Sequence, residues 1–151
     1  MNRKETATSY YADAFACSQA VFAAFGKEMG LTADQCLKIG SAFGGGMARK
    51  QLTCGAVTGA MMVVGLLYGR GLCDEVSQKE ITYEKTNELF KEFQSRNGSL
   101  NCRDLLQGLN LNDPEELMKI QELGLFKSSC VKYIQDAVVI VEGMIKGSDV
   151  T

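Results

Sequence analysis

The chain has 151 residues, a mass of 16.4 kDa and a formal net charge of −2 at pH 7. Hydrophobic residues make up 46% and charged residues 23%, a balance typical of a folded protein, and the length predicts one domain over 1–151. The near-neutral charge argues against a nucleic-acid partner, and the absence of histidine excludes imidazole catalysis and imidazole metal ligands.

The first part of the chain predicts two helices. Apolar residues recur at steps of three or four over 11–29, which predicts an amphipathic helix that Gly30 ends. Thr32 and Gln35 then form a capping box. The second helix is expected to end near Phe43.

The segment 51–69 carries no charged residue. Its length reaches the lower range for a membrane-spanning helix, but polar and small residues weaken its first half. We interpret it as the central buried helix of a helical protein and expect no membrane span. The N-terminus lacks an apolar leader, so we expect a cytoplasmic protein with reduced cysteines.

Four more helices are predicted in the second half. A capping box that begins at Ser77 opens the first of them, Asn97-Gly98 ends it, and a shorter helix from Asn101 to Leu106 follows. The residues expected to face inward from the long helix are Tyr83, Leu89, Phe90 and Phe93.

Asp113-Pro114 is a strong helix start, and Ser128 or Ser129 opens the last helix, which Gly147 ends. The core face predicted for that helix is Val131, Ile134, Val138, Val141 and Ile145. Hairpin signals for β-strands are absent. The predicted fold class is therefore all-α, as a single-domain bundle of about five to seven helices.

Six cysteines are the chemically unusual feature: Cys17, Cys36, Cys54, Cys73, Cys102 and Cys130. Three of them, Cys54, Cys102 and Cys130, fall at expected helix starts, where the positive end of the helix dipole lowers the pKa of a thiol. Cys17 falls inside the first predicted helix, where a cysteine commonly serves as a small buried residue. Because no CxxC spacing exists, a joint site must be assembled by tertiary folding.

Two glycine groups have both a structural and a functional interpretation. Gly55 and Gly59 lie four apart, so they either let another helix approach closely or expose the backbone around Cys54 to a ligand. The run 44–46, followed by Arg49 and Lys50, could cradle an anion, although it lacks the spacing of a phosphate-binding loop.

The run Phe43-Gly44-Gly45-Gly46-Met47-Ala48-Arg49 and the sequence Cys54-Gly55-Ala56-Val57-Thr58-Gly59 resemble the C-GCAxxG-C-C family, which carries four characteristic cysteines and a CGAxxG motif. An earlier cysteine, Cys17, and two later ones, Cys102 and Cys130, complete the order. The resemblance covers nearly the whole chain.

The resemblance implies a small helical redox protein in which Cys17, Cys54, Cys102 and Cys130 are the functional residues. Cys36 and Cys73 would then be extra thiols, the first in the core and the second exposed. Family members are described as encoded near transporter genes, which implies association with a transporter system. The resemblance supplies neither a substrate nor an electron partner.

Three functions remain open at this stage. The first is thiol–disulfide chemistry by an oxidoreductase or electron-transfer protein, with Cys54 as the attacking thiol and the other three as its partners. The second is a four-cysteine site that binds zinc or an iron–sulfur cluster through the same residues. The third is a helical structural protein with core cysteines. The pairing of the cysteines and self-association into a homo-oligomer also stay open.

Overall fold

A computed structural model describes residues 1–147, which contain eight α-helices, two short 3-10 helices and no β-strand. The all-α prediction is confirmed. The last residues of the predicted domain, 148–151, lie outside the described part. The helices are α1 (Arg3–Ala12), α2 (Cys17–Gly26), α3 (Ala33–Gly40), α4 (Gly55–Tyr68), α5 (Gln78–Asn97), α6 (Cys102–Leu105), α7 (Pro114–Glu122) and α8 (Ser129–Gly147).

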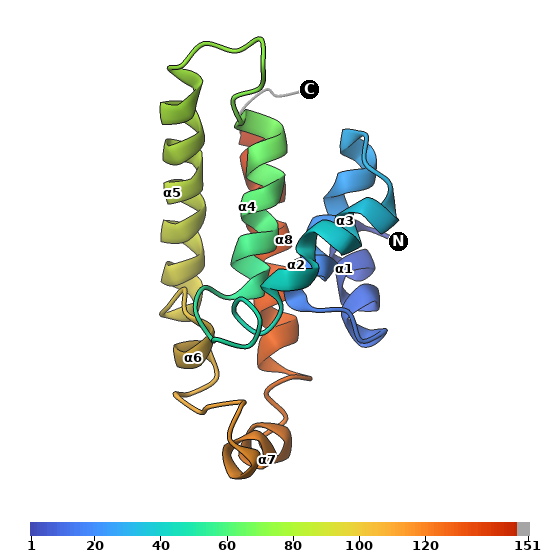
Figure 1. Cartoon of the computed structure of the whole chain (residues 1–151), viewed down its shortest axis with the longest axis vertical. Helices are drawn as coiled ribbons and strands as arrows, with labels where there is room; N and C mark the ends of the chain where they lie inside the picture. The colour runs from blue at the N-terminus through green and yellow to red at the C-terminus, as the bar shows by residue number, and fades with distance from the viewer. Residues whose placement is uncertain (148–151) are drawn as a thin grey trace.

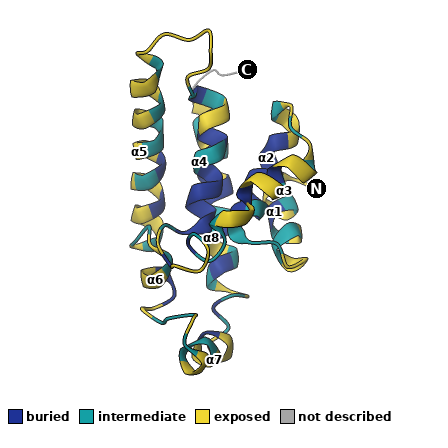
Figure 2. Ribbon diagram, viewed as in Figure 1, coloured by how far each residue is buried: buried dark blue, intermediate teal, exposed yellow. Residues whose placement is uncertain are grey.

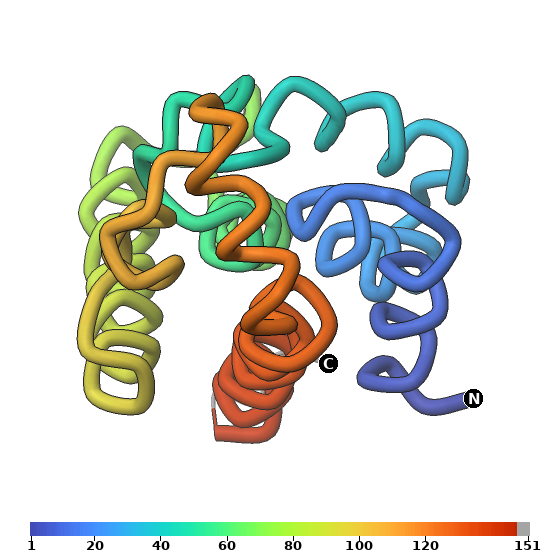
Figure 3. Tube along the Cα trace, turned by 90° about the horizontal axis from the view of Figure 1, so that it is seen from below, coloured from blue at the N-terminus to red at the C-terminus, as the bar shows by residue number. Residues whose placement is uncertain are grey.

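Helix α4 lies at the centre of the bundle (Figure 1). It packs against α2 on one side and α5 on the other, while α8 contacts α1, α2, α4 and α5. Seen from below, α8 lies between α5 and α1 (Figure 3). Figure 2 shows the buried residues gathered on α2 and α4, with α5 exposed on its outer side. The apolar stripes therefore meet in one main core around α4.

The uncharged segment forms the buried helix that its composition predicts. Nine of the fourteen residues of α4 are buried, and α4 begins at Gly55 because the preceding residues form a loop. No helix within residues 1–147 combines the length and apolar character needed to cross a membrane.

The prediction of one continuous helix over 11–29 is wrong. Helix α1 ends at Ala12, and α2 begins at Cys17 after a break in which Ala14 adopts a φ of +68°. A left-handed alanine is unfavourable, so no sequence signal marks this break. As a result, Cys17 is the first residue of a helix rather than an interior one.

Three other helix boundaries follow the sequence closely. Thr32 and Gln35 form the predicted capping box of α3, with hydrogen bonds of 3.1 and 2.9 Å. Asp113 caps α7 by accepting from the Glu115 N–H at 2.9 Å. Helix α3 itself ends at Gly40, and a 3-10 turn, Ser41–Phe43, carries the chain to the predicted end.

The details predicted for α5 are partly wrong. Ser77 has helical backbone angles and its side chain makes no capping hydrogen bond. Leu89 and Phe93 are buried as predicted, but Tyr83 is 54% exposed. Gly98, with a φ of +87°, ends the helix.

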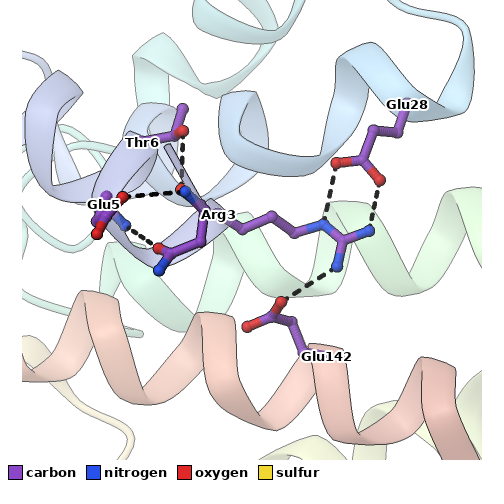
Figure 4. Close-up of polar contacts among 6 residues, drawn as sticks. Arg3, Glu5, Thr6, Glu28 and Glu142 are labelled. Carbon is purple, nitrogen blue, oxygen red and sulfur yellow. Dashed lines mark hydrogen bonds and ion pairs between the residues drawn. The ribbon is translucent and has the colours of Figure 1, made fainter.

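Arg3 ties the N-terminal helix to two distant segments (Figure 4). Its guanidinium forms ion pairs with Glu28 and with Glu142 on α8, the second at 3.2 Å. The same group lies 4.9 Å from the centroid of the Phe25 ring. Because α1 is held against α2 and α8 in this way, the Tyr11 end of α1 has a defined position near the cysteines described next.

Candidate functional site

The four cysteines of the predicted site lie at the N-terminal ends of four helices. Cys17 is the first residue of α2, Cys54 immediately precedes α4, Cys102 is the first residue of α6, and Cys130 is the second of α8. Residues far apart in the chain thus place their thiols at the positive ends of helix dipoles, which stabilise a thiolate.

All four cysteines line one cavity of about 700 Å³. The cavity lies between the main core and a smaller apolar cluster that includes Leu106, Ile120 and Leu125. Cys54 belongs to the main core and Cys130 to the smaller cluster, while Cys17 packs against both. The structure therefore brings the four thiols to one junction in the fold.

The glycines of the CGAxxG sequence bring α4 and the N-terminus of α2 together. A methyl group placed on Gly59 would lie 2.7 Å from the Ser18 carbonyl oxygen, and one on Gly55 would lie 3.1 Å from Cys17 Cβ. Both contacts are too close for a larger residue. The close-approach interpretation of these glycines is therefore correct, and its effect is to place Cys17 beside the start of α4.

The loop that leads to Cys54 has an unusual backbone. Five consecutive residues from Gly45 to Arg49 have φ between +51° and +69°, and three of them are not glycine. Each such non-glycine residue costs about 1 kcal/mol or more. A methyl group on Gly46 would lie 2.7 Å from Cys102 Cβ, so the loop packs directly against α6.

This loop uses its own backbone donors. The N–H groups of residues 47–52 all donate to carbonyl oxygens of the segment 42–47. These six N–H groups are therefore not directed at a ligand. Of the predicted anion cradle, the cationic side chains of Arg49 and Lys50 form no ion pair with a described residue.

Hydrogen bonds fasten the loop to α6. Cys54 N–H donates to Leu100 O at 2.8 Å and Cys102 N–H donates to Leu52 O at 2.6 Å, on either side of an antiparallel bridge between Thr53 and Asn101. The two short segments that carry Cys54 and Cys102 are thus held side by side.

Gln51 is a structural residue of the site that sequence reasoning missed. It is 5% exposed, its side-chain amide donates to Leu109 O at 2.8 Å, and its oxygen accepts from Leu111 N–H at 3.0 Å. These bonds hold the segment after α6 over the cavity, where Leu111 lines the wall. A single glutamine in a loop carries no sequence signal of such a role.

Cys130 has a different electrostatic environment from the other three thiols. A side-chain hydrogen bond with Cys17 and another with Tyr11 lower the pKa of Cys130, against the opposing effect of burial. The hydrogen bond to Cys130 and burial raise the pKa of Cys17 well above its ordinary value. Of the two hydrogen-bonded thiols, Cys130 is therefore the one that ionises more readily.

For Cys54 and Cys102, burial is the dominant effect on the pKa. Burial raises the pKa of Cys54 to about 12, although the N–H groups of Ala56 and Val57 oppose the rise. Burial, followed by the charge of Cys130, raises the pKa of Cys102 to about 12. Both side chains are therefore neutral thiols near pH 7.

The sequence model of the C-GCAxxG-C-C family, whose description is "Putative redox-active protein", matches residues 15–144. The chain belongs to this family. The match includes all four cavity cysteines and the loop that precedes Cys54. Neither a curated protein nor a solved structure matches the chain significantly.

The two other cysteines of this C-GCAxxG-C-C protein lie away from the cavity. Cys36 is fully buried in α3, where its sulfur packs against Gly26 of α2. Cys73 is exposed in the loop between α4 and α5. Neither lines the cavity, which agrees with the prediction that they are extra thiols.

The cysteines are all present as free thiols. Within residues 1–147, no three side chains of histidine, cysteine, aspartate or glutamate form a group that could hold a metal ion in this arrangement. Among the cavity thiols, Cys17 and Cys130 are joined by a side-chain hydrogen bond.

Proposed function

We propose that the chain carries out dithiol–disulfide exchange, with Cys130 as the attacking thiol and Cys17 as its resolving partner. The observation that carries the proposal is the hydrogen bond between the two side chains, which lowers the pKa of Cys130. The attacking species in exchange is a thiolate, so the thiol that ionises most readily is favoured. Cys54, expected from the sequence to attack, is disfavoured because burial raises its pKa to about 12.

The exchange would proceed in two steps. The Cys130 thiolate attacks one sulfur of an oxidised partner, which forms a mixed disulfide and releases the other sulfur as a thiolate that takes up a proton. Cys17 then loses its proton and attacks the Cys130 sulfur, which forms a Cys17–Cys130 disulfide and releases the second thiol. Two electrons pass from the protein to the partner disulfide.

The remaining cysteines suggest a second pair. Cys54 and Cys102 flank the Thr53–Asn101 bridge, and assigning Cys17 to Cys130 leaves them as each other's partner. Because all four line one cavity, a disulfide formed at the first pair has neighbouring thiols with which to exchange. We include this second pair in the proposal: Cys54 and Cys102 would reduce the Cys17–Cys130 disulfide and become oxidised in its place.

The test is the rate of alkylation of each cysteine in the reduced protein as a function of pH, measured by mass spectrometry. We expect Cys130 to react with a midpoint below that of Cys73, the exposed thiol outside the cavity that serves as the internal reference. Mild oxidation should then yield a Cys17–Cys130 disulfide in non-reducing peptide maps.

Two results would overturn the proposal. One is a Cys130 midpoint at or above that of Cys73, because Cys130 would then not be the favoured thiolate. The other is stoichiometric zinc or iron in anaerobically purified protein that protects the four cavity cysteines together, because this would establish the four-cysteine metal site instead.

A further inference from the structure

A second cavity of about 960 Å³ opens beside the cysteine cavity. The two share the wall residues Tyr11, Ala14, Ala16, Gly45, Arg49 and Phe126. Each volume falls within the range of about 300–1,000 Å³ typical of sites for small molecules. A ligand in the second cavity would therefore lie next to the thiols, with Tyr11 at the boundary.

The charged residues of the two cavities are all cationic. The chain has more acidic than basic residues, 18 against 16, yet Arg49 and Lys127 are the charged side chains that line the cavities, and no carboxylate does so within residues 1–147. Neither of these cations forms an ion pair with a described residue. Two unneutralised cations on one wall favour an anionic ligand.

The local backbone and the apolar wall residues agree with this preference. Ala16, which precedes α2, lies on the shared wall, so the N-terminal end of α2 borders this space, with the Ala16 N–H bonded to the Gln19 side-chain oxygen at 2.8 Å. Phe15 and Phe126 add aromatic surface. The site therefore suits a small molecule with a carboxylate at one end and a short apolar portion.

We propose that the second cavity binds the carboxylate end of a low-molecular-weight disulfide, through Arg49 and Lys127, so that its S–S bond lies at Cys130. This inference rests on the proposed exchange function and specifies its substrate class. Tyr11 connects the two parts of the site, because it lines both cavities and contacts the Cys130 sulfur.

The reaction balances without another reactant. Cys130 forms a mixed disulfide with one half of the ligand and releases the other half as a thiol. Cys17 then displaces the second half. One bound disulfide is reduced to two carboxylate-bearing thiols, and the protein dithiol is oxidised to the Cys17–Cys130 disulfide.

The test compares three disulfide probes of similar size with the fully reduced protein under anaerobic conditions. They are dithiodipropionate, which is anionic, bis(hydroxyethyl) disulfide, which is neutral, and cystamine, which is cationic. The loss of Cys17 and Cys130 thiols is followed by acid quenching and mass mapping, and each rate is divided by the rate of the same probe with dithiothreitol. We expect the anionic probe to react about tenfold faster than the neutral one, and the cationic probe to react slowest.

Charge variants then test the site. Arg49→Gln and Lys127→Gln should each reduce the anionic-to-neutral rate ratio severalfold, and Arg49→Lys should retain most of it. Lys79→Gln, on the exposed side of α5, is the matched control and should leave the ratio unchanged. Added salt should lower the ratio in the wild-type protein.

The outcomes separate this inference from the function on which it rests. Equal rates for all three probes, or a ratio unaffected by Arg49→Gln and Lys127→Gln, would overturn the anionic substrate class while leaving thiol exchange intact. Loss of no cysteine thiol with any small probe or with a protein disulfide would overturn both. Rapid exchange with a protein disulfide but with no small probe would overturn the small-molecule substrate alone and leave thiol exchange intact.

Discussion

A hydrogen bond joins the side chains of Cys17 and Cys130, across the contact between the first turns of α2 and α8. The two residues come from opposite ends of the chain, and the pKa of Cys130 is lowered whereas that of Cys17 is raised. The proposed attacking thiol thus differs from the proposed resolving thiol in how readily it ionises. Tyr11 strengthens this difference from the α1 side, because its hydrogen bond also lowers the pKa of Cys130.

Tyr11→Phe should raise the pKa of Cys130, because it removes one of the two hydrogen bonds that lower it. We expect the alkylation midpoint of Cys130 to shift upward by about one pH unit or somewhat less. Tyr10→Phe is the matched control, since Tyr10 packs edge-on against Phe15 and is not among the residues that line either cavity. Equal midpoints in the two variants would show that Tyr11 has no influence on the thiol.

Burial of Cys54 predicts a loss of stability at high pH. Its pKa is about 12 in the folded state against an ordinary value of 9.0, so the unfolded chain releases this proton first as the pH rises. Below about pH 9 both states keep the proton and the contribution is constant. Between about pH 9 and 12 the free energy of unfolding should fall by about 1 kcal/mol per pH unit.

The measurement is urea unfolding of the wild-type protein and of Cys54→Ala across that pH range. The stability difference between them should shrink as the pH rises, because the variant lacks the titrating thiol. Cys73→Ala, which removes an exposed thiol, should show a difference from wild type that does not change in this way. A constant difference for Cys54→Ala would contradict the prediction.

Gly59→Ala should destabilise the protein by about 1–3 kcal/mol, because its methyl group would lie 2.7 Å from Ser18 O and 3.0 Å from Val21 Cβ. Gly65→Ala is a control in the same helix, since nothing lies within 4 Å of the added methyl group. That change should be neutral or stabilising by up to about 1 kcal/mol. Urea midpoints of the two variants provide the comparison, and equal effects would argue against close packing of α2 on α4.

Gln51→Met should cost about 2–4 kcal/mol, because it leaves Leu109 O and Leu111 N–H without their partner. It should also speed the alkylation of Cys102, because the segment 109–111, of which Leu111 lines the cavity, would be held less firmly in place. Gln94→Met, on the exposed face of α5, is the control and should change neither quantity. Unchanged stability in Gln51→Met would mean that water replaces the lost bonds.

Most helix positions could be predicted because their signals are local. The capping box at Thr32 and the Asp113-Pro114 start each depend on residues within one turn, and both predictions are confirmed. The break between α1 and α2 could not be predicted, because Ala14 adopts a left-handed conformation that its side chain disfavours. Tertiary contacts of α1 and α2 compensate for that cost, and a local pattern does not reveal them.

The site was only partly accessible from sequence. Local sequence signals correctly predicted that Cys54, Cys102 and Cys130 lie at helix starts. The family resemblance added Cys17 to the predicted site. The grouping of all four around one cavity depends on the approach of α2 to α4 and on the loop that packs against α6. The pKa order among them depends on hydrogen bonds between residues of different helices, so no single segment encodes it.

The segments that form the walls of the cysteine cavity are synthesised at different times, and this order determines when the cavity can form. The segment 45–54 is made early, but residues 100–103, the backbone partners of residues 51–54, and the side of the cavity formed by Cys130 are made much later. A growing chain therefore presents Cys17 and Cys54 without their native neighbours until most of it has been translated. The contact between Cys17 and Cys130 consequently forms only after α8 has been made.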